Sequence, residues 1–198
     1  MKFLSRRHFV SSTSAFGISA FLPASLWAGI EGIPRSDYGF ATTADEVVAG
    51  MDLSGKTVLI TGCNSGLGYE SMRTLAGAGA HVIGTARTAE KAEQACASVA
   101  GKTTPMVCEL TDFNTVVSCA DQVRALDVPI DVLMCNAGVM ALMKLEQVYG
   151  LEKQFVVNHL GHYLLTRKII DLVEAADAGR VVVLSSIGYQ NAPAEGIQ

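Results

Sequence analysis

Charged residues are scarce in this sequence, and that scarcity excludes some classes of protein. They make up 17% of the 198 residues, whereas apolar residues make up 49%. A chain with this balance can bury a substantial core, so we expect one ordered domain rather than a disordered chain. The net charge is −4. Because binding to phosphate backbones depends on clustered Lys and Arg, nucleic acid is not expected as a partner.

Long apolar runs and metal-type spacings are also missing. Beyond the first thirty residues no uninterrupted apolar run is long enough to span a membrane, so no stable transmembrane helix is expected. The number of cysteines is odd, and they show no C-x-x-C or Cys/His spacing, which favours buried free thiols over disulfides or a metal site. His159 and His162 lack a third ligand at a suitable spacing, so no metal is predicted. The cysteines are Cys63, Cys96, Cys108, Cys119 and Cys135.

Residues 1–28 have the pattern of an export signal. Residues 5–10, Ser-Arg-Arg-His-Phe-Val, resemble the twin-arginine motif, and a weakly apolar run follows over residues 16–27. This pattern predicts an exported, periplasmic protein, which would fold before export. A Sec signal, or a chance pair of arginines in a cytoplasmic protein, remains the alternative. Residues 29–50 are expected to form a connector with a short helix around 44–49.

Residues 51–198 alternate between short apolar runs and helical patterns, with short joints between them. The apolar runs are rich in β-branched residues and lack polar alternation, as expected for strands covered on both faces. This alternation predicts a Rossmann-type α/β fold, a doubly wound parallel sheet with helices on both faces. The predicted strands are 57–61, 81–85, 105–108, 131–135 and 180–184, and the predicted helices are 67–78, 89–99, 113–126 and 150–176.

A glycine-rich loop, T-G-C-N-S-G-L-G at residues 61–68, directly follows the first predicted strand, and a helix follows the loop. Gly62 lets the chain turn sharply, Gly66 lets backbone amides approach a diphosphate, and Gly68 lets the helix pack closely on the sheet. The helix N-terminus offers unpaired N–H groups to the anion. The order of strand, loop and helix predicts a dinucleotide site, and no Gly-Lys-Ser or Gly-Lys-Thr closes the loop as a P-loop would require. The predicted contacts are Gly62, Asn64, Ser65, Gly66, Leu67 and Gly68.

Four motifs in this order resemble the short-chain dehydrogenase/reductase family. The loop 61–68 matches T-G-x-x-x-G-x-G, and Asn136-Ala137-Gly138 matches the N-N-A-G motif, with Cys135 in place of the first Asn. Asn158 stands where the family has its helix asparagine, and Ser186 stands where it has its catalytic serine. The resemblance runs from about residue 52 to the end of the chain, and residues 150–166 are most similar to the branch of retinol dehydrogenases and protochlorophyllide reductases.

The resemblance implies hydride transfer between a nicotinamide and a carbonyl or alcohol carbon of a small-molecule substrate, whose identity the sequence does not indicate. In the family a serine, here Ser186, binds the substrate oxygen. An asparagine, here Asn158, holds a water that links a lysine to solvent. The family's Tyr-x-x-x-Lys is not found, because Tyr189 lies too close to Ser186 and no lysine follows it.

We therefore expect a chain that is truncated at the C-terminal edge of the sheet and inactive as it stands. The alternative is a noncatalytic NADP(H)-binding module, or a subunit that a partner completes. Family members commonly pair through the long helix, so a homo-oligomer is expected only of a complete chain.

The end of the second predicted strand indicates which dinucleotide is bound. An NAD site usually has an acidic residue there, but this chain has Ala86 and Arg87. A guanidinium can bind a 2′-phosphate through two parallel hydrogen bonds, so NADP(H) is predicted over NAD(H). Glu109-Leu110 stands where the family's aspartate holds the adenine. Asn136, Ala137 and Gly138 are expected to let the nicotinamide-side ribose pass close to the fourth strand.

Overall fold

The computed structural model describes residues 36–186. The twin-arginine-like segment, the first part of the connector and Tyr189 lie outside the described residues. The chain divides into two units, one of which is Val48–Leu184 and contains the sheet. Helix α2 (Ala44–Val48), which precedes the sheet in the sequence, begins where predicted. It starts with a capping box in which the Thr43 hydroxyl accepts from the Glu46 N–H and the Glu46 carboxylate accepts from the Thr43 N–H.

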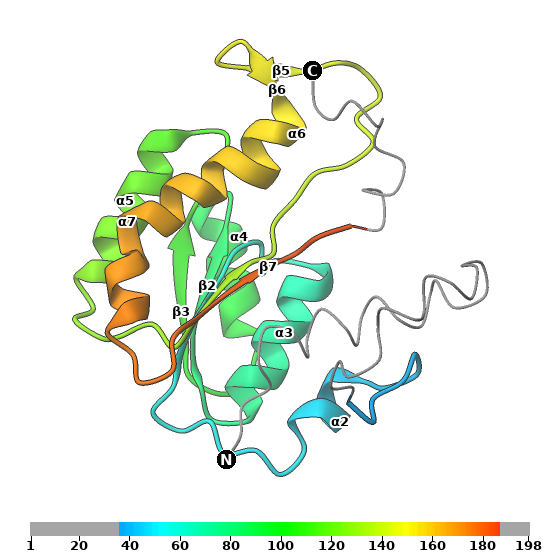
Figure 1. The fold of residues 1–198 in the computed structure, drawn as a ribbon, viewed down its shortest axis with the longest axis vertical. Coiled ribbons are helices and arrows are strands. Elements are labelled where there is room, and N and C mark those ends of the chain that lie inside the picture. The colour runs from blue at the N-terminus through cyan, green and yellow to red at the C-terminus, as the bar shows by residue number, and fades with distance from the viewer. Residues whose placement is uncertain (1–35, 187–198) are drawn as a thin grey trace, which may run out of the picture. The chain divides into compact units, whose positions relative to one another are not determined.

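Five parallel strands form the central sheet, in the order β3-β2-β1-β4-β7 (Figure 1). Each strand lies within two residues of its predicted bounds, and the predicted doubly wound parallel sheet is confirmed. The strands are β1 (Thr57–Ile60), β2 (His81–Ala86), β3 (Thr103–Val107), β4 (Val132–Cys135) and β7 (Arg180–Val183).

Helices cover both faces of this sheet, as predicted. On one face α3 (Gly66–Gly77) and α4 (Ala89–Ala97) pack on Val58, Ile60 and Val82. On the other face α5 (Phe113–Arg124) and α7 (His162–Glu174) pack on Leu59, Ile83 and Leu133. Because successive side chains of a strand point to opposite faces, one apolar run supplies two separate cores.

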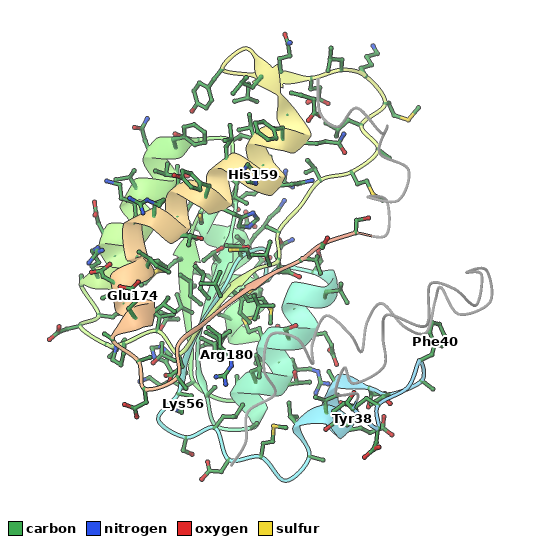
Figure 2. The ribbon with its side chains drawn as sticks, in the orientation of Figure 1. Tyr38, Phe40, Lys56, His159, Glu174 and Arg180 are labelled. Atoms are coloured by element: carbon green, nitrogen blue, oxygen red, sulfur yellow. The ribbon has the colours of Figure 1, made fainter. Side chains whose placement is uncertain are left out.

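Polar contacts hold β1 and β4 together at both ends. At the amino ends the Lys56 ammonium lies 2.8 Å from the Asp131 carboxylate, whose other oxygen accepts from the Thr57 N–H at 2.9 Å (Lys56 is labelled in Figure 2). At the carboxyl ends the Asn136 side-chain amide donates to the Thr61 carbonyl at 2.9 Å. The two strands beside which the candidate site lies are therefore fixed in register at both ends.

The prediction of one helix over 150–176 is wrong in its first part and in its middle. The chain first forms a hairpin of β5 (Gln147–Val148) and β6 (Leu151–Glu152), because Tyr149 and Gly150 both have positive φ, as a tight hairpin turn requires. The helix begins only at α6 (Lys153–Phe155), where the Glu152 carboxylate caps it by accepting from the Gln154 and Phe155 N–H groups, at 2.9 and 2.6 Å.

A π-helical segment, η2 (Val156–Gly161), then separates α6 from α7. Such segments occur mostly as single turns inside α-helices, frequently at functional sites. Gly161 is pressed against Leu110, since a Cβ at Gly161 would lie 2.8 Å from the Leu110 Cβ and carbonyl oxygen. The widened turn therefore lies against the segment that follows β3.

All five cysteines are buried free thiols, as predicted. Burial raises the pKa of the Cys63 thiol to about 12, and it also raises the pKa of Cys96 and Cys135. Among residues 36–186 no group of three His, Cys, Asp or Glu side chains could hold a metal ion. In the same part of the chain no helix is both long and apolar enough to cross a bilayer.

Candidate nucleotide-binding site

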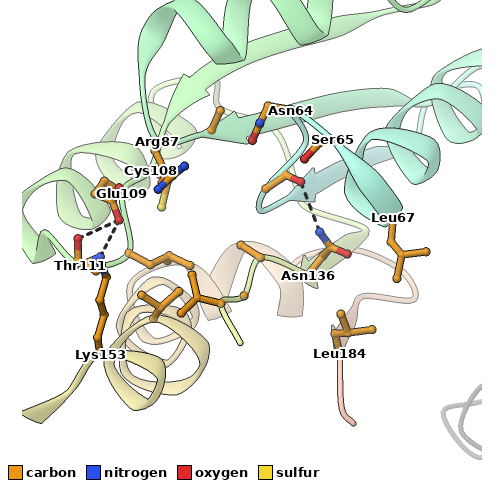
Figure 3. A pocket seen from close by; sticks show the side chains of 17 residues that line it. Asn64, Ser65, Leu67, Arg87, Cys108, Glu109, Thr111, Asn136, Lys153 and Leu184 are labelled. Atoms are coloured by element: carbon orange, nitrogen blue, oxygen red, sulfur yellow. Dashed lines mark hydrogen bonds between the residues drawn. The ribbon is translucent and has the colours of Figure 1, made fainter. Parts of the chain in front are cut away.

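The strand order reverses between β1 and β4, and a cavity of about 430 Å³ lies at the carboxyl ends of these strands (Figure 3). From β1 the chain adds β2 and β3 on one side of the sheet and β4 and β7 on the other. In open α/β sheets, ligands bind in the crevice at this switch point. The volume falls within the range of small-molecule and cofactor pockets.

Ten of the twelve predicted cofactor contacts line this cavity. The other two, Gly66 and Gly68, lie outside the lining: Gly66 is exposed and Gly68 is buried behind the loop. Whether the ten contact a nucleotide stays a prediction. They are Gly62, Asn64, Ser65, Leu67, Arg87, Glu109, Leu110, Asn136, Ala137 and Gly138.

Two glycines of the loop, Gly62 and Gly68, leave no room for a side chain, whereas Gly66 has open space around it and a φ of +61°. Gly62 has φ +74°, and a Cβ there would lie 2.9 Å from the Ala137 Cβ. At Gly68 a Cβ would lie 2.3 Å from the Gly62 carbonyl oxygen and 2.5 Å from the Asn136 side-chain nitrogen. The loop, the first turn of α3 and the segment after β4 therefore pack so closely that no side chain fits at Gly62 or Gly68. We call residues 61–68 the glycine loop.

The N-terminus of α3 differs from those of its neighbours in having no side-chain cap. Thr88 caps α4 and Asp112 caps α5, each by accepting a backbone N–H. Ser65, at the equivalent position of α3, is extended and makes no such bond. N–H groups at a helix start carry partial positive charge and favour an anion. Because Asn64, Ser65 and Leu67 line the cavity, this partial positive charge lies at the cavity wall.

The segment after β4 is fixed by hydrogen bonds to Thr61. The Asn136 and Ala137 N–H groups both donate to the Thr61 hydroxyl oxygen, at 3.0 Å each. The Asn136 side chain is occupied with the Thr61 carbonyl. On the far side of the same hydroxyl lies His162 Nε2, at 2.8 Å. Asn136 therefore acts here through its position in the framework, while Ala137 and Gly138 present a small surface to the cavity.

The charged side chains of the cavity gather around the ends of β2 and β3. Arg87 is exposed at the rim, and within residues 36–186 its guanidinium makes no hydrogen bond or ion pair. Glu109 folds back so that one carboxylate oxygen accepts from the Thr111 N–H at 3.1 Å and from its hydroxyl at 2.9 Å. Lys153 reaches the lining from α6, and its ammonium lies 2.7 Å from the Glu146 carboxylate (Figure 3 shows Lys153, Glu109 and Arg87).

Asn158 and Ser186, the two predicted catalytic residues, do not line the cavity. Asn158 is exposed in η2, and its side chain is bonded to the segment after β4. There it accepts from the Val139 N–H and donates to the Val139 carbonyl, both at 2.8 Å. Ser186 is exposed and lies two residues beyond Leu184, outside the unit that contains the cavity. Its role stays a prediction.

Residues 56–197 match the family described as "short chain dehydrogenase". The chain belongs to this family. The narrower resemblance of this chain to retinol dehydrogenases and protochlorophyllide reductases stays a prediction.

Two relatives in the family are similar to this chain over part of their own length. The human WW domain-containing oxidoreductase is 38% identical over 161 residues, which are 79% of this chain and 39% of the relative. The chloroplastic short-chain dehydrogenase TIC 32 B of Brassica napus is 36% identical over 82% of this chain and 54% of its own length. The chain therefore spans about two fifths to one half of these relatives.

Two solved structures have the same fold as this chain. A metagenomic short-chain oxidoreductase, crystallised in complex with NADP, superposes with a TM-score of 0.62 at 29% identity, over 73% of this chain and 68% of that one. A protein from Mycobacterium Paratuberculosis superposes with a TM-score of 0.63 at 36% identity, over 75% of this chain and 51% of that one.

Several residues that line the cavity were not among the predicted contacts. Most are sequence neighbours of predicted contacts and would be found by widening each motif by one or two positions: Ala86, Cys108, Thr111 and Val139. Val157 is next to Asn158. Lys153 and Leu184 gave no signal of their own, because Lys153 stood inside a range predicted as continuous helix and Leu184 at the end of a predicted strand.

Proposed function

We propose that this protein is an NADP(H)-dependent oxidoreductase that transfers hydride between the nicotinamide and a carbonyl or alcohol carbon of a small-molecule substrate. The observation that carries the proposal is the uncapped start of α3 beside a loop in which Gly62 and Gly68 leave no room for a Cβ, next to one cavity. A glycine loop of this shape leaves backbone N–H groups as the surface offered to a diphosphate.

Each part of the lining suits one part of the dinucleotide. Amides of Asn64, Ser65 and Leu67 would hold the diphosphate, and Arg87 the 2′-phosphate. Glu109 and Leu110 would lie against the adenine, and Ala137 and Gly138 against the second ribose. When bound, the nicotinamide supplies or accepts the hydride. The chain's own part in this scheme is to bind, orient and partly enclose the cofactor.

The preference for NADP(H) rests on Arg87. A charge-assisted hydrogen bond contributes about 1.5–3 kcal/mol, which is roughly 10- to 150-fold in affinity. We expect the unaltered chain to bind NADPH more tightly than NADH, and Arg87→Ala to lose about that factor for NADPH while its affinity for NADH stays the same. Isothermal titration with both nucleotides measures this. Lys153→Met is the matched control, because Lys153 is a cation of the same cavity that is already paired with Glu146.

Equal affinity for NADPH and NADH in the unaltered chain would contradict the cofactor preference and leave the nucleotide site itself standing. An equal loss of both nucleotides in Arg87→Ala would mean that Arg87 supports the fold of the site rather than the 2′-phosphate.

The second candidate function is a noncatalytic NADP(H)-binding module. It is favoured by the lining of the cavity, which includes neither Asn158 nor Ser186. The oxidoreductase proposal keeps Ser186 as the group that binds the substrate oxygen. Oxidation of NADPH in the presence of a panel of aldehydes and ketones separates the two candidates. Turnover that Ser186→Ala abolishes supports the enzyme, whereas tight binding without turnover supports the module.

Export by the twin-arginine route is part of the proposal and rests on residues 5–10. A fusion of residues 1–50 to a reporter that is active only after folding in the cytoplasm tests it. We expect the reporter in the periplasm, and Arg6→Lys with Arg7→Lys to retain it in the cytoplasm. Periplasmic reporter with both lysine substitutions would contradict this route.

A further inference from the structure

His162 is a buried imidazole, only 6% exposed, that lies where three parts of the chain meet. It occupies the first position of α7, directly after η2. Its Nε2 lies 2.8 Å from the hydroxyl oxygen of Thr61, at the start of the glycine loop, and its Nδ1 lies 3.3 Å from the Asn158 carbonyl oxygen. It is too deep to act as a surface residue, and the function proposed above gives it no role.

The protons around the Thr61 hydroxyl decide which tautomer His162 adopts. A hydroxyl has one proton to donate and two lone pairs to accept with. The N–H groups of Asn136 and Ala137 approach the two lone pairs. The hydroxyl proton then has two choices, His162 Nε2 at 2.8 Å or the Met134 carbonyl at 3.4 Å.

The shorter of these contacts is also the one with a free acceptor. The Met134 carbonyl already receives the Thr61 N–H at 3.1 Å, and it shares the Asn136 N–H, also at 3.1 Å, with the Thr61 hydroxyl. His162 Nε2 has no other partner among the described residues. The imidazole is then neutral and carries its proton on Nδ1, facing the Asn158 carbonyl. Burial lowers the pKa of His162, which agrees with a neutral ring.

We propose that His162 is a positioning residue of the nucleotide site, which takes the Thr61 hydroxyl proton and thereby holds the residues after β4 against the glycine loop. With its proton directed at His162, the hydroxyl keeps both lone pairs for the Asn136 and Ala137 amides. Ala137 is the residue that leaves no room for a Cβ at Gly62. A small shift of the segment after β4 therefore changes the width of the cavity where the second ribose would lie.

The same helical segment holds the other end of this stretch. Asn158 binds both backbone groups of Val139 through its side chain, and its own carbonyl accepts from His162. Residues 136–139 are thus fastened at one end through Thr61 and His162 and at the other through Asn158. Asn158 and His162 are four residues apart, so both lie on one side of the helix.

The first test reads the tautomer directly and needs no ligand. Nitrogen NMR of the chain labelled at histidine distinguishes the two neutral tautomers and the imidazolium among its four histidines. We expect one histidine, absent from the spectrum of His162→Gln, to carry its proton on Nδ1 and to accept at Nε2 at pH 7. A proton on Nε2, or a charged ring at that pH, would overturn the inference.

The second test asks whether the link to Thr61 matters for the site, and this part rests on the function proposed above. His162→Leu removes the acceptor and Thr61→Val removes the hydroxyl. Each is expected to lower NADPH affinity by about 2- to 10-fold, the equivalent of one neutral hydrogen bond, and the double variant to lose no more than either one. Losses that add up in the double variant would mean that the two residues act separately.

Conservative variants keep the test valid if the apolar ones fail to fold. His162→Gln offers a side-chain carbonyl to the Thr61 hydroxyl, and Thr61→Ser keeps the hydroxyl itself, so both should regain most of the affinity. His159→Leu is the matched control, because His159 is exposed on the same helical segment (Figure 2) and should leave affinity unchanged. If Gln at 162 binds no better than Leu, packing rather than the proton acceptor is what matters, and the inference fails.

The two proposals fail in different ways. If the unaltered chain binds no pyridine nucleotide, the proposed function falls, and the positioning role is judged from the tautomer and from hydrogen exchange at the Asn136 and Ala137 amides. His162→Leu should speed that exchange and His159→Leu should not. If the unaltered chain binds NADPH but the His162 variants bind equally well and exchange equally slowly, the positioning role falls and the proposed function stands.

Discussion

The two walls of the cavity are built by opposite means. The glycine loop is made of backbone and depends on side chains being absent, since a Cβ at Gly62 or Gly68 would meet other atoms at 2.9 Å or less. The facing wall, from the end of β4 and from η2, depends on side chains being present: Asn158 grips Val139, and His162 reaches Thr61 across 101 positions of sequence.

The difference decides how each wall should respond to substitution. Atoms of the backbone that are already in contact cannot move apart without moving a strand or a helix. A single substitution in the glycine loop should therefore cause a large loss of stability. A hydrogen-bonded wall loses one contact at a time, and water can replace part of each, so it should loosen in steps. Substitutions on the two walls therefore distinguish a large loss of stability at one position from a series of small losses.

The largest effect is expected at Gly68. Gly68→Ala places a Cβ 2.3 Å from the Gly62 carbonyl oxygen, a backbone atom that is held by the turn after β1. Overpacking typically costs about 1–3 kcal/mol, and we expect the upper end of this range or complete loss of folding. Urea unfolding of the whole chain measures it.

Gly77→Ala is the matched control for Gly68→Ala, because both residues lie in α3 and no atom lies within 4 Å of a Cβ at Gly77. There alanine should stabilise the protein slightly, by up to about 1 kcal/mol, since it restricts the unfolded chain and favours helix. If the two variants are equally stable, the glycine loop is not close-packed at Gly68, and the proposed difference between the two walls is wrong.

A smaller effect is expected at Asn158 on the other wall. Asn158→Ala removes two hydrogen bonds to Val139, and because Asn158 is exposed, water can take over part of them. We expect a loss of about 1–2 kcal/mol in the free energy of unfolding, with faster hydrogen exchange at the Val139 amide. Asn114→Ala, at an exposed asparagine of α5, should be close to neutral. A loss at Asn158 as large as that at Gly68 would show that this wall also fails abruptly.

The same contrast explains what the sequence could predict. Strand bounds, the doubly wound order and the sharp turn at Gly62 follow from local signals, namely apolar runs, their alternation with helical patterns, and a glycine after a strand. The hairpin before α6 was missed because Tyr149 adopts positive φ, which its residue type does not suggest.

The hydrogen-bonded wall could not be predicted from local sequence patterns. His162 was considered only as a metal ligand, because nothing near it in sequence reveals that the first residue of the glycine loop faces it. Asn158 was singled out by its motif, but its exposure and its hydrogen bonds to Val139 depend on how η2 packs on the segment after β4, which no spacing rule predicts. Contacts between distant segments need the packed chain to be seen.

The smallest effect expected is a dependence of stability on pH through His162. Burial lowers the pKa of His162; its bond to the Asn158 carbonyl opposes this and the charge of nearby His159 adds to it, while the group facing it from β1 is the uncharged Thr61. The folded protein therefore takes up this proton at lower pH than the unfolded chain, whose ordinary value is 6.5. Stability from this group is complete above that value and declines as pH falls from it through the folded pKa.

His162→Gln isolates this contribution, because glutamine does not titrate. The advantage in unfolding free energy of the unaltered chain over the variant should be greater at pH 8 than at pH 5, as measured by urea unfolding at both. Burial also lowers the pKa of His81, but that residue is present in both proteins and cancels in the difference. If this difference in unfolding free energy does not change with pH, the folded protein protonates His162 as readily as the unfolded chain does. The hydrogen-bonded wall would then not depend on a neutral imidazole.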